Sequence, residues 1–229
     1  SLGAGSFGTH AARVEGEFAG VQTGVRAGGS YFESDGYRKN NRNIESGAFA
    51  EARRDRDDDA LVIRFSGAHQ NLRLPGARSV QPSIGQNELD LDRRGTTTPL
   101  DYALRDDGIL QLDYFRNAGA WSAILGASYR RKDQESYFDF SGFPDYREVG
   151  LGVVSLTPRI RFDHSTAKLP GVLIVGVDWY SWDYQRSLAS SPAVIGQPVH
   201  RVTADQTNRA VYVTETLAMG AATFAGSPV

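Results

Sequence analysis

The sequence predicts an all-β protein whose strands run up and down in one antiparallel sheet, as in a transmembrane β-barrel. Three observations predict this class: period-2 alternation of apolar and polar residues, connections that alternate between short and long, and a composition rich in strand formers. The 229 residues include 25 glycines, 10 tyrosines and 11 phenylalanines but a single methionine, which favours many strands and turns over packed helices. No apolar run approaches the roughly 20 residues of a membrane-spanning helix, but a barrel strand of roughly 9 to 11 residues is only half apolar.

Alternation is clearest between residues 154 and 163. One face of this strand would carry Val154, Leu156, Pro158, Ile160 and Phe162, and the other would carry Ser155, Thr157, Arg159, Arg161 and Asp163. Because an arginine on the lipid face near the bilayer midplane costs about 2 to 4 kcal/mol, we expect the apolar set to face lipid and the polar set to face the lumen. Proline donates no ladder hydrogen bond, so a bulge or a local break is expected at Pro158.

The same pattern predicts further strands along the chain, about ten in all and the start of another at residues 224–229. The clearer ones span residues 60–70, 110–114 and 121–130, and the fainter ones span residues 44–53 and 210–217. Aromatic residues gather where strands would leave the bilayer, and we expect them in an outer aromatic girdle. They are Tyr31, Phe32, Tyr137, Phe138, Trp179, Tyr180, Trp182 and Tyr184.

The connections alternate in length. Short ones are expected near residues 20–23, 55–59, 117–120, 166–171 and 220–223, and longer polar ones near residues 34–43, 71–107, 132–148 and 187–207. Outer-membrane barrels combine short periplasmic turns with longer extracellular loops. We therefore expect one end of the sheet to hold Asp57, Asn117 and Lys168 and the opposite end to hold Arg38, Arg93, Pro144 and Pro198. The chain begins in one strand and ends in another, which predicts a fragment of a larger barrel.

Composition and charge argue against several classes of function. The formal net charge of -2 gives no basic excess for tracking a nucleic-acid backbone. Cysteine is absent, which excludes a disulfide framework and a thiolate metal site. The four histidines follow no metal-binding spacing, and the glycine fingerprint at residues 3–8 is followed by no helical pattern. We expect no cofactor, no protein metal site and no nucleic-acid partner.

Several segments, in this order and spacing, resemble the TonB-dependent outer-membrane receptors of the ferric siderophore type. The opening Gly5-Ser6-Phe7-Gly8-Thr9 is similar to the first barrel strand after the plug domain, and Ser34-Asp35-Gly36-Tyr37-Arg38 to the first sizeable outer loop. The next large loop is matched by Leu74-Pro75-Gly76, Asp92-Arg93-Arg94-Gly95 and Thr98-Pro99-Leu100-Asp101-Tyr102. The resemblance extends along nearly the whole chain.

The resemblance implies a 22-stranded barrel that is filled by an N-terminal plug, in the outer membrane of a Gram-negative bacterium. Residues 1–229 would be the front part of that barrel without the plug domain. The implied activity is uptake of a ferric siderophore or similar iron chelate, driven by TonB through the missing plug and N-terminal segment. The partners would be the chelate, outer-membrane lipid and TonB, and no enzymatic activity is expected.

The candidate ligand-binding residues are the arginines and tyrosines of the expected outer loops. Arginine offers paired donors to carboxylates, and tyrosine offers a rigid amphipathic surface. The iron would arrive already held by its chelator, so the protein would supply no metal ligand. The candidates are Arg73, Arg78, Arg93, Arg94, Tyr102, Tyr137 and Tyr146.

Two other classes of function stay open on the sequence. One is a passive porin or structural barrel, and the other is a soluble carbohydrate-binding or glycoside-hydrolysing β-protein. A plug domain and TonB box encoded upstream of Ser1 would favour the receptor, whereas a signal peptide joined directly to Ser1 would favour the porin. The sequence does not identify the ligand.

Overall fold

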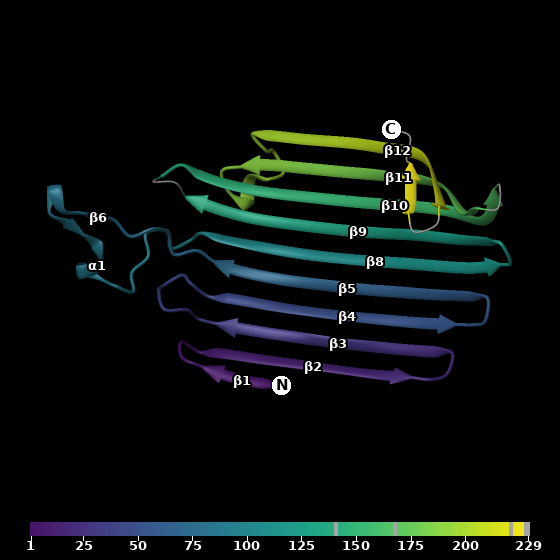
Figure 1. Cartoon of the computed structure of the whole chain (residues 1–229). Coiled ribbons are helices and arrows are strands. Elements are labelled where there is room, and N and C mark those ends of the chain that lie inside the picture. The colour runs from purple at the N-terminus through teal and green to yellow at the C-terminus, as the bar shows by residue number, and fades with distance from the viewer. Residues whose placement is uncertain (140–141, 167–168, 220–221, 227–229) are drawn as a thin grey trace.

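One antiparallel sheet of eleven strands makes up most of the molecule (Figure 1). The structure is a computed structural model that describes residues 1–139, 142–166, 169–219 and 222–226. Within these residues each strand pairs with its neighbours in chain order, which confirms the up-and-down topology. The strands are β1 (Leu2–Gly5), β2 (Thr9–Ala19), β3 (Thr23–Ser34), β4 (Asn43–Asp55), β5 (Asp59–Arg73), β8 (Tyr102–Ala118), β9 (Trp121–Asp139), β10 (Pro144–Thr166), β11 (Leu169–Ala189), β12 (His200–Met219) and β13 (Ala222–Gly226).

Within the described residues, short elements occur in two of the connections between these strands. The connection between β5 and β8 contains β6 (Val80–Gln81), the 3-10 helix η1 (Pro82–Ile84), β7 (Gln86–Asn87) and the single helical turn α1 (Glu88–Leu91). The connection between β11 and β12 contains the 3-10 helix η2 (Pro192–Val194). In the described residues the sheet is open, and β1 and β13 are its edges.

The two ends of the sheet differ as the alternation of short and long connections predicts. At the turn end, the Asn117 N–H donates to the Asp58 carbonyl at 2.7 Å and the Asp55 N–H donates to the Gln22 carbonyl at 2.8 Å. At the opposite end, the Lys39 N–H donates to the Arg94 carbonyl at 2.7 Å. The predicted ends are therefore confirmed for Asp57, Asn117, Arg38 and Arg93, and for Pro144 and Pro198 at the long-loop end. Lys168 lies outside the described residues.

The strand register divides the side chains into two faces of opposite character. Along one row across the sheet the directly paired residues are Ile63, Leu112, Ala127, Leu156 and Trp179. The next row, one residue further along each strand, contains Arg64, Gln111, Ser128, Ser155 and Tyr180. We call these surfaces the apolar face and the polar face. The two predicted residue sets of the strand at 154–163 fall on opposite faces, which confirms their alternation.

Large apolar side chains of the apolar face are exposed. Leu156 is 40% exposed, Ile160 is 51% exposed and Phe18 is 67% exposed. Water-soluble proteins rarely expose a continuous apolar surface of this extent. A bilayer would cover such a surface, because barrel strands place an apolar band against lipid and polar residues inside.

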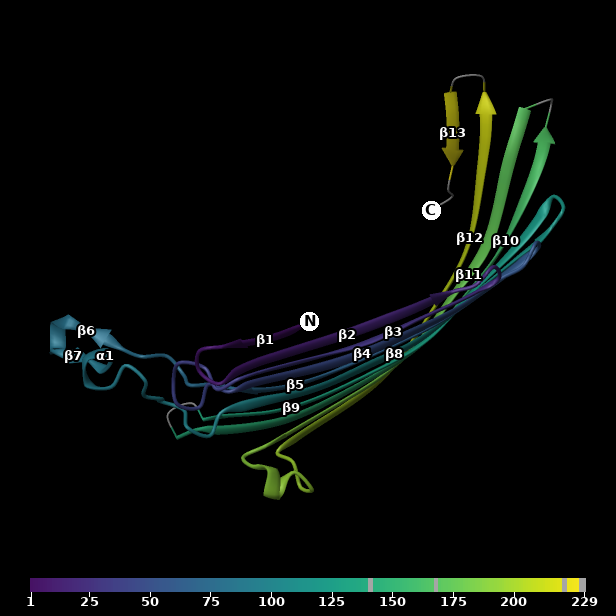
Figure 2. The same cartoon turned by 90° about the horizontal axis from the view of Figure 1, so that it is seen from below.

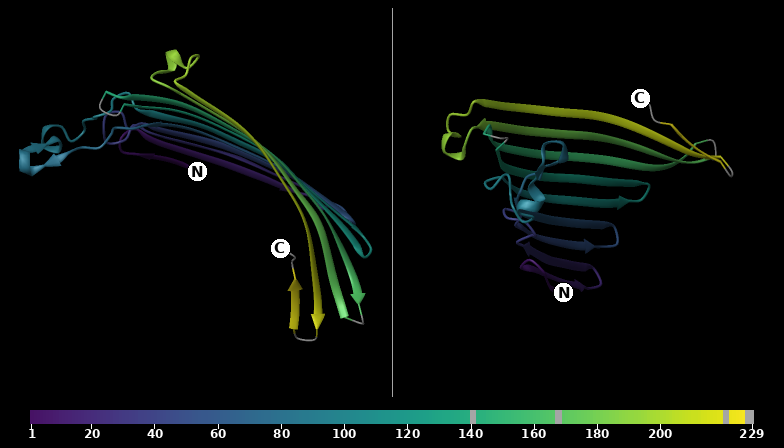
Figure 3. Two further views of the ribbon diagram at one scale, coloured as in Figure 1. Left: turned by 90° about the horizontal axis from the view of Figure 1, so that it is seen from above. Right: turned by 90° about the vertical axis from the view of Figure 1, so that its left-hand side faces the viewer.

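The turns are staggered from one hairpin to the next. Asp59 at the start of β5 pairs with Arg116, whereas β8 continues to Ala118. Trp121 at the start of β9 pairs with Phe162, whereas β10 continues to Thr166. Such a progressive shift of register is what tilted strands in a barrel wall require. The sheet is accordingly twisted and curved, as Figures 2 and 3 show.

The ladder between β10 and β11 is interrupted at Pro158. The pairs run to Leu156 with Trp179 and resume at Arg159 with Gly176 in the same register. On its other side Pro158 still pairs with Leu125 of β9. The predicted local break is confirmed, and the unchanged register shows that the pairs of Thr157 and Pro158 are missing and that there is no bulge.

The strands extend much further toward the long-loop end than the alternation predicted. The expected loop at 132–148 is mostly strand, because β9 continues to Asp139 and β10 begins at Pro144. Likewise the expected loop at 187–207 shrinks to residues 190–199, and the one at 71–107 shrinks to 74–101. In these extensions polar residues occupy both faces of β9, so the sequence loses its period-2 signal there.

Candidate functional site

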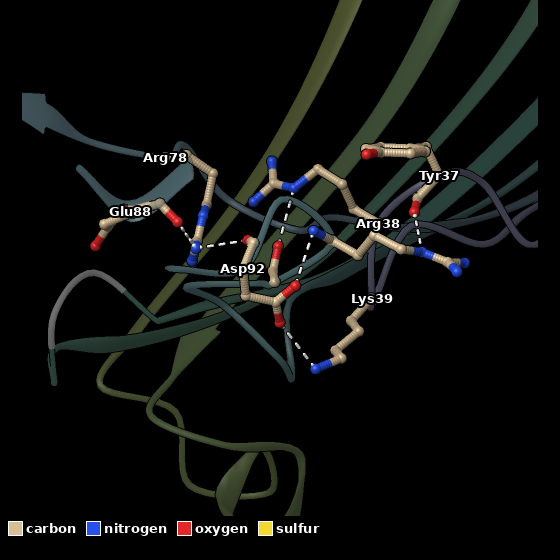
Figure 4. Close-up of polar contacts among 8 residues, drawn as sticks. Tyr37, Arg38, Lys39, Arg78, Glu88 and Asp92 are labelled. Carbon is tan, nitrogen blue, oxygen red and sulfur yellow. Dashed lines mark hydrogen bonds and ion pairs between the residues drawn. The ribbon is translucent and has the colours of Figure 1, made fainter. Parts of the chain in front are cut away.

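The connection between β5 and β8, residues 74–101, projects beyond the long-loop end of the sheet (Figures 1 and 2). We call it the arm. Inside the arm, the Arg78 guanidinium donates to the carbonyl oxygens of Glu88 and Asp92, with Nη2 at 2.8 Å from the latter (Figure 4). The Glu88 carboxylate in turn accepts from the Ser79 N–H at 2.7 Å. These bonds tie the outgoing and returning parts of the arm together.

The neighbouring connection, residues 35–42 between β3 and β4, supports the base of the arm. We call it the collar. The Lys39 ammonium pairs with the Asp92 carboxylate at 3.0 Å, and Arg94 Nε donates to the Tyr37 carbonyl at 3.0 Å (Figure 4). The Lys39 ammonium, followed by the Arg94 N–H, holds the pKa of the Asp92 carboxyl below its usual range. The arm is therefore anchored to the collar as well as to its own strands.

The three predicted arginines of the arm have different surroundings. Arg78 is partly buried and occupied by the carbonyl groups inside the arm. Arg94 is exposed, but its guanidinium lies 5.9 Å above the Tyr37 ring and also bonds to the collar. Arg93 is exposed, and its side chain makes no hydrogen bond or ion pair within the described residues. Of these three side chains, Arg93 is the one available to a ligand.

The other four candidates, expected in loops, lie on strands instead. Tyr102 begins β8, Tyr137 lies in β9, Tyr146 lies in β10 and Arg73 ends β5. Tyr102 stacks on Tyr137 with ring centroids 6.3 Å apart, and the Arg73 guanidinium lies 5.1 Å above the Tyr102 ring. Their expected position in loops is wrong because the strands continue past the apolar band.

These four residues form one cluster, but it lies on the side of the sheet that carries the apolar face. Tyr102 pairs with Tyr137, and Tyr137 pairs with Tyr146. Tyr137 lies eight positions after Tyr129 in β9, so the two side chains are on the same face, and Tyr129 pairs with Val154 of the apolar face. Tyr146 is only 2% exposed. If the polar face lines the lumen, this cluster stands on the outer wall and does not meet a ligand inside.

A second cluster, which the sequence analysis missed, lies on the polar face near the long-loop end. In one row Lys132, Leu151 and Tyr184 are paired across β9, β10 and β11. We call the cluster the mouth patch, and it comprises Arg105, Asp107, Arg130, Lys132, Trp182, Tyr184 and Arg186. Asp107 accepts from Arg105 at 2.7 Å and from Arg130 at 2.9 Å. With four cations and one carboxylate, the patch has an excess of positive charge.

The aromatic run at residues 179–184 was assigned to the outer girdle, and the register corrects this. Trp179 lies on the apolar face, because it pairs with Leu156. Tyr180, Trp182 and Tyr184 lie on the polar face. A run of aromatic residues in a strand must divide between two faces, and applying this rule to the sequence would have placed Tyr180, Trp182 and Tyr184 on the face opposite Trp179.

Ion pairs line the polar face between the mouth patch and the turn end of the sheet. Arg64 bonds to Glu51 at 2.7 Å and also to Asp113, across three adjacent strands. Further along the sheet Arg26 pairs with Glu15 at 2.6 Å. Charged groups in such numbers are costly against lipid. The polar face is therefore suited to a water-filled or protein-filled lumen.

The described residues hold neither a metal cluster nor a spanning helix. No group of three or more His, Cys, Asp or Glu side chains within them could hold a metal ion. In the same residues, no helix has the length and apolar character needed to cross a membrane.

Comparison with known proteins relates the fold to outer-membrane receptors. No family model matches the chain, and no curated protein matches its sequence. Among solved structures, the ferripyoverdine receptor of the outer membrane of Pseudomonas aeruginosa bound to ferripyoverdine has a TM-score of 0.75 at 11% identity, covering 99% of this chain and 35% of the receptor.

Two further receptor structures are similar to the same degree. The unliganded ferric citrate transporter FecA has a TM-score of 0.71 at 15% identity, covering 93% of this chain and 32% of FecA. The open form of the ferric-catecholate import receptor Fiu from E. coli K12 has a TM-score of 0.71 at 12% identity, covering 94% of this chain and 41% of Fiu. The chain thus has the fold of a barrel section from siderophore receptors, and it spans about a third of the length of the first structures it matches.

Proposed function

We propose that this chain is the front part of the barrel of a TonB-dependent receptor that takes up a ferric siderophore or a similar iron chelate. The receptor would lie in the outer membrane of a Gram-negative bacterium, and its plug domain and TonB contact would be supplied by other parts of the protein. The remaining barrel strands would close the sheet between β1 and β13. No bond chemistry is required, because the chelator already holds the iron.

The division of the sheet into an exposed apolar face and a charged polar face carries this proposal. A sheet with this division suits a barrel wall between lipid and a polar interior. The fold of the siderophore receptors supports the more specific assignment. A soluble β-protein would leave the apolar face in water, which counts against the soluble alternative.

The mouth patch and Arg93 are the proposed contacts for the chelate. Ferric citrate and ferric catecholates carry carboxylate or catecholate oxygens. Arginine and lysine donate charge-assisted hydrogen bonds to such oxygens. Tyr184 and Trp182 add rigid amphipathic surface beside those cations. Neighbouring strands are about 4.8 Å apart, so Lys132 of β9 and Tyr184 of β11 are close enough to contact one small ligand.

Uptake of radioactive iron by cells that produce the complete protein tests the class of function. Ferric pyoverdine, ferric citrate and a ferric catecholate would be offered separately, in cells with and without TonB. We expect accumulation of at least one chelate that requires TonB and an energised inner membrane. Entry of all three chelates without TonB would support the porin instead, and recovery of the protein in the soluble fraction would exclude both barrel functions.

Two adjacent residues provide a matched pair for the ligand site. Lys132 lies on the polar face in the mouth patch, whereas Arg131 lies on the opposite face and bonds to Asp133. Lys132→Gln and Arg131→Gln each remove one positive charge, and the two positions are adjacent along β9. We expect Lys132→Gln to weaken chelate binding about tenfold, the value of one charge-assisted hydrogen bond, and Arg131→Gln to leave binding unchanged. Equal effects of the two variants would place the site elsewhere.

A further inference from the structure

The neck of the arm, where the chain leaves β5 and returns to β8, is held by two side chains of the collar. Arg38 donates to three carbonyl oxygens: Nε to Gly95 at 3.0 Å, Nη1 to Gly76 at 2.6 Å and Nη2 to Pro75 at 3.0 Å. Pro75 and Gly76 lie on the outgoing limb of the neck, and Gly95 lies on the returning limb. One guanidinium therefore bridges both limbs.

Asn40 of the collar also bridges the two limbs of the neck, at a point closer to the strands. Its Nδ2 lies 3.0 Å from the Leu74 carbonyl on the outgoing limb, and 2.6 and 3.0 Å from the Thr98 and Asp101 carbonyls on the returning limb. Asn40 adopts a left-handed backbone conformation with φ of 52°, which asparagine tolerates better than most residues. The side chain thereby turns its amide toward the neck.

The limbs of the neck are not paired as a β-ladder, so their carbonyl groups depend on such donors. Within the neck the Thr98 hydroxyl donates to the Leu74 carbonyl at 2.7 Å, and the Thr96 hydroxyl donates to the Pro75 carbonyl at 3.0 Å. Partly buried carbonyl groups without donors destabilise a structure. Removing the collar side chains would leave the Gly76 and Gly95 carbonyls without a donor from the described residues, and it would take one of several donors from each of the other four carbonyls.

We propose that Arg38 and Asn40 are positioning residues that lock the neck and hold the arm as a rigid extension of the barrel wall. The arm is then a fixed part of the extracellular mouth and does not close over a ligand as a mobile lid. Arg93 lies between Asp92, which pairs with Lys39 of the collar, and Gly95, whose carbonyl accepts from Arg38, so the lock also limits the movement of Arg93. This consequence for ligand binding rests on the proposed function, whereas the rigidity of the arm does not.

Hydrogen exchange of the complete protein in lipid vesicles tests the lock without any ligand. The Thr97 N–H, bonded to Pro75, and the Leu74 N–H, bonded to Asp101, report on the neck. We expect Arg38→Ala to raise exchange of residues 74–101 at least tenfold while β5 and β8 exchange as before. Asn40→Asp should act similarly, because a carboxylate repels the carbonyl oxygens to which the amide donates.

Two further variants separate the lock from general effects. Arg42→Ala removes a guanidinium from the same collar, but one that bonds to Glu33 of β3 and does not touch the arm; it should leave exchange of the arm unchanged. Asn40→Gly keeps the left-handed backbone accessible and removes only the amide, so it should resemble Asn40→Asp. Unchanged exchange of the arm in Arg38→Ala, or equal increases in Arg38→Ala and Arg42→Ala, would overturn the proposal.

A distance measurement between spin labels at Ile84 in the arm and Arg116 in β8 supplies a second readout. The wild type should give one narrow distance distribution, and Arg38→Ala a broad one. An equally broad distribution in the wild type would show that the arm is not rigid. With ferric pyoverdine, ferric citrate and a ferric catecholate as probes, Arg38→Ala should raise the dissociation rate of whichever probe binds. If none binds, the proposed function fails, but exchange and distance still decide the lock.

Discussion

Single glycines show how closely neighbouring strands of the sheet are packed, and Gly28 is an example in which a backbone atom leaves no room for a side chain. A Cβ atom at this position of β3 would lie 2.6 Å from the Phe49 ring and 2.8 Å from the Val14 carbonyl oxygen. The ring can move, but the carbonyl belongs to the adjacent strand β2. Glycine is therefore required here by the close approach of two backbones.

We expect Gly28→Ala to lower the free energy of unfolding by about 1 to 3 kcal/mol, because the ladder must shift to admit the methyl group. Gly16→Ala is the matched control, since no heavy atom lies within 4 Å of the Cβ that it would add. That variant should be neutral or slightly stabilising. Urea titration of the complete protein in lipid vesicles measures both, and equal losses would contradict the packing at Gly28.

The titration of Asp92 tests the contact between arm and collar. Its pKa is depressed by the Lys39 ammonium and by the Arg94 N–H, so its contribution to the arm is present above the pKa of an unfolded aspartate, about 3.9. The contribution is lost as the pH falls through the depressed pKa. Chemical shifts of Asp92 recorded against pH should give a midpoint below this unfolded value, and Lys39→Met should move the midpoint upward. A midpoint that Lys39→Met leaves unchanged would contradict this contact.

At the scale of elements, the sequence predicts the strands well where apolar and polar residues alternate. Residues 154–163 alternate strictly between apolar and polar side chains, and the register places the two sets on opposite faces. The extension of β9 to Asp139 escapes prediction, because Arg131, Asp133 and Glu135 occupy the side that is apolar nearer the turns. Local sequence patterns do not give the register between strands. The sequence therefore does not predict the mouth patch, whose residues lie on three strands.

Substitutions at Leu156 and Thr157 test which face of β10 meets lipid. Leu156 lies on the apolar face and Thr157 on the polar face, where its hydroxyl lies 3.4 Å from the Gly126 carbonyl. We expect Leu156→Arg to cost about 2 to 4 kcal/mol near the bilayer midplane, and Thr157→Arg to cost little in a polar lumen. Folding into bilayers followed by urea titration compares the two. Equal losses, or a larger loss from Thr157→Arg, would show that the faces are reversed.

At the scale of the whole molecule, the described connections at one end of the sheet are all short, whereas the opposite end carries the long connections 35–42, 74–101 and 190–199 beside the short turn at residues 6–8 (Figure 1). This division could be predicted from the sequence, because glycine and aspartate clusters mark the turns and their spacing matches the strands. The arm could not be predicted beyond its length, since its shape depends on Arg38 and Asn40, which reach it from a distant part of the sequence. Local patterns carry no signal for such contacts.

Single cysteine substitutions test the direction in which the sheet crosses the membrane. These 229 residues contain no cysteine, so within them each new thiol is the only one to react with a maleimide. Arg93 in the arm and Asp57 in a short turn are both exposed, and they lie at opposite ends of the sheet. In intact cells a membrane-impermeant maleimide should label Arg93→Cys and spare Asp57→Cys, because short turns of such barrels face the periplasm. Permeabilising the outer membrane should then expose Asp57→Cys. Labelling of Asp57→Cys alone in intact cells would mean the reverse orientation, and labelling of both would mean that the sheet does not separate two compartments.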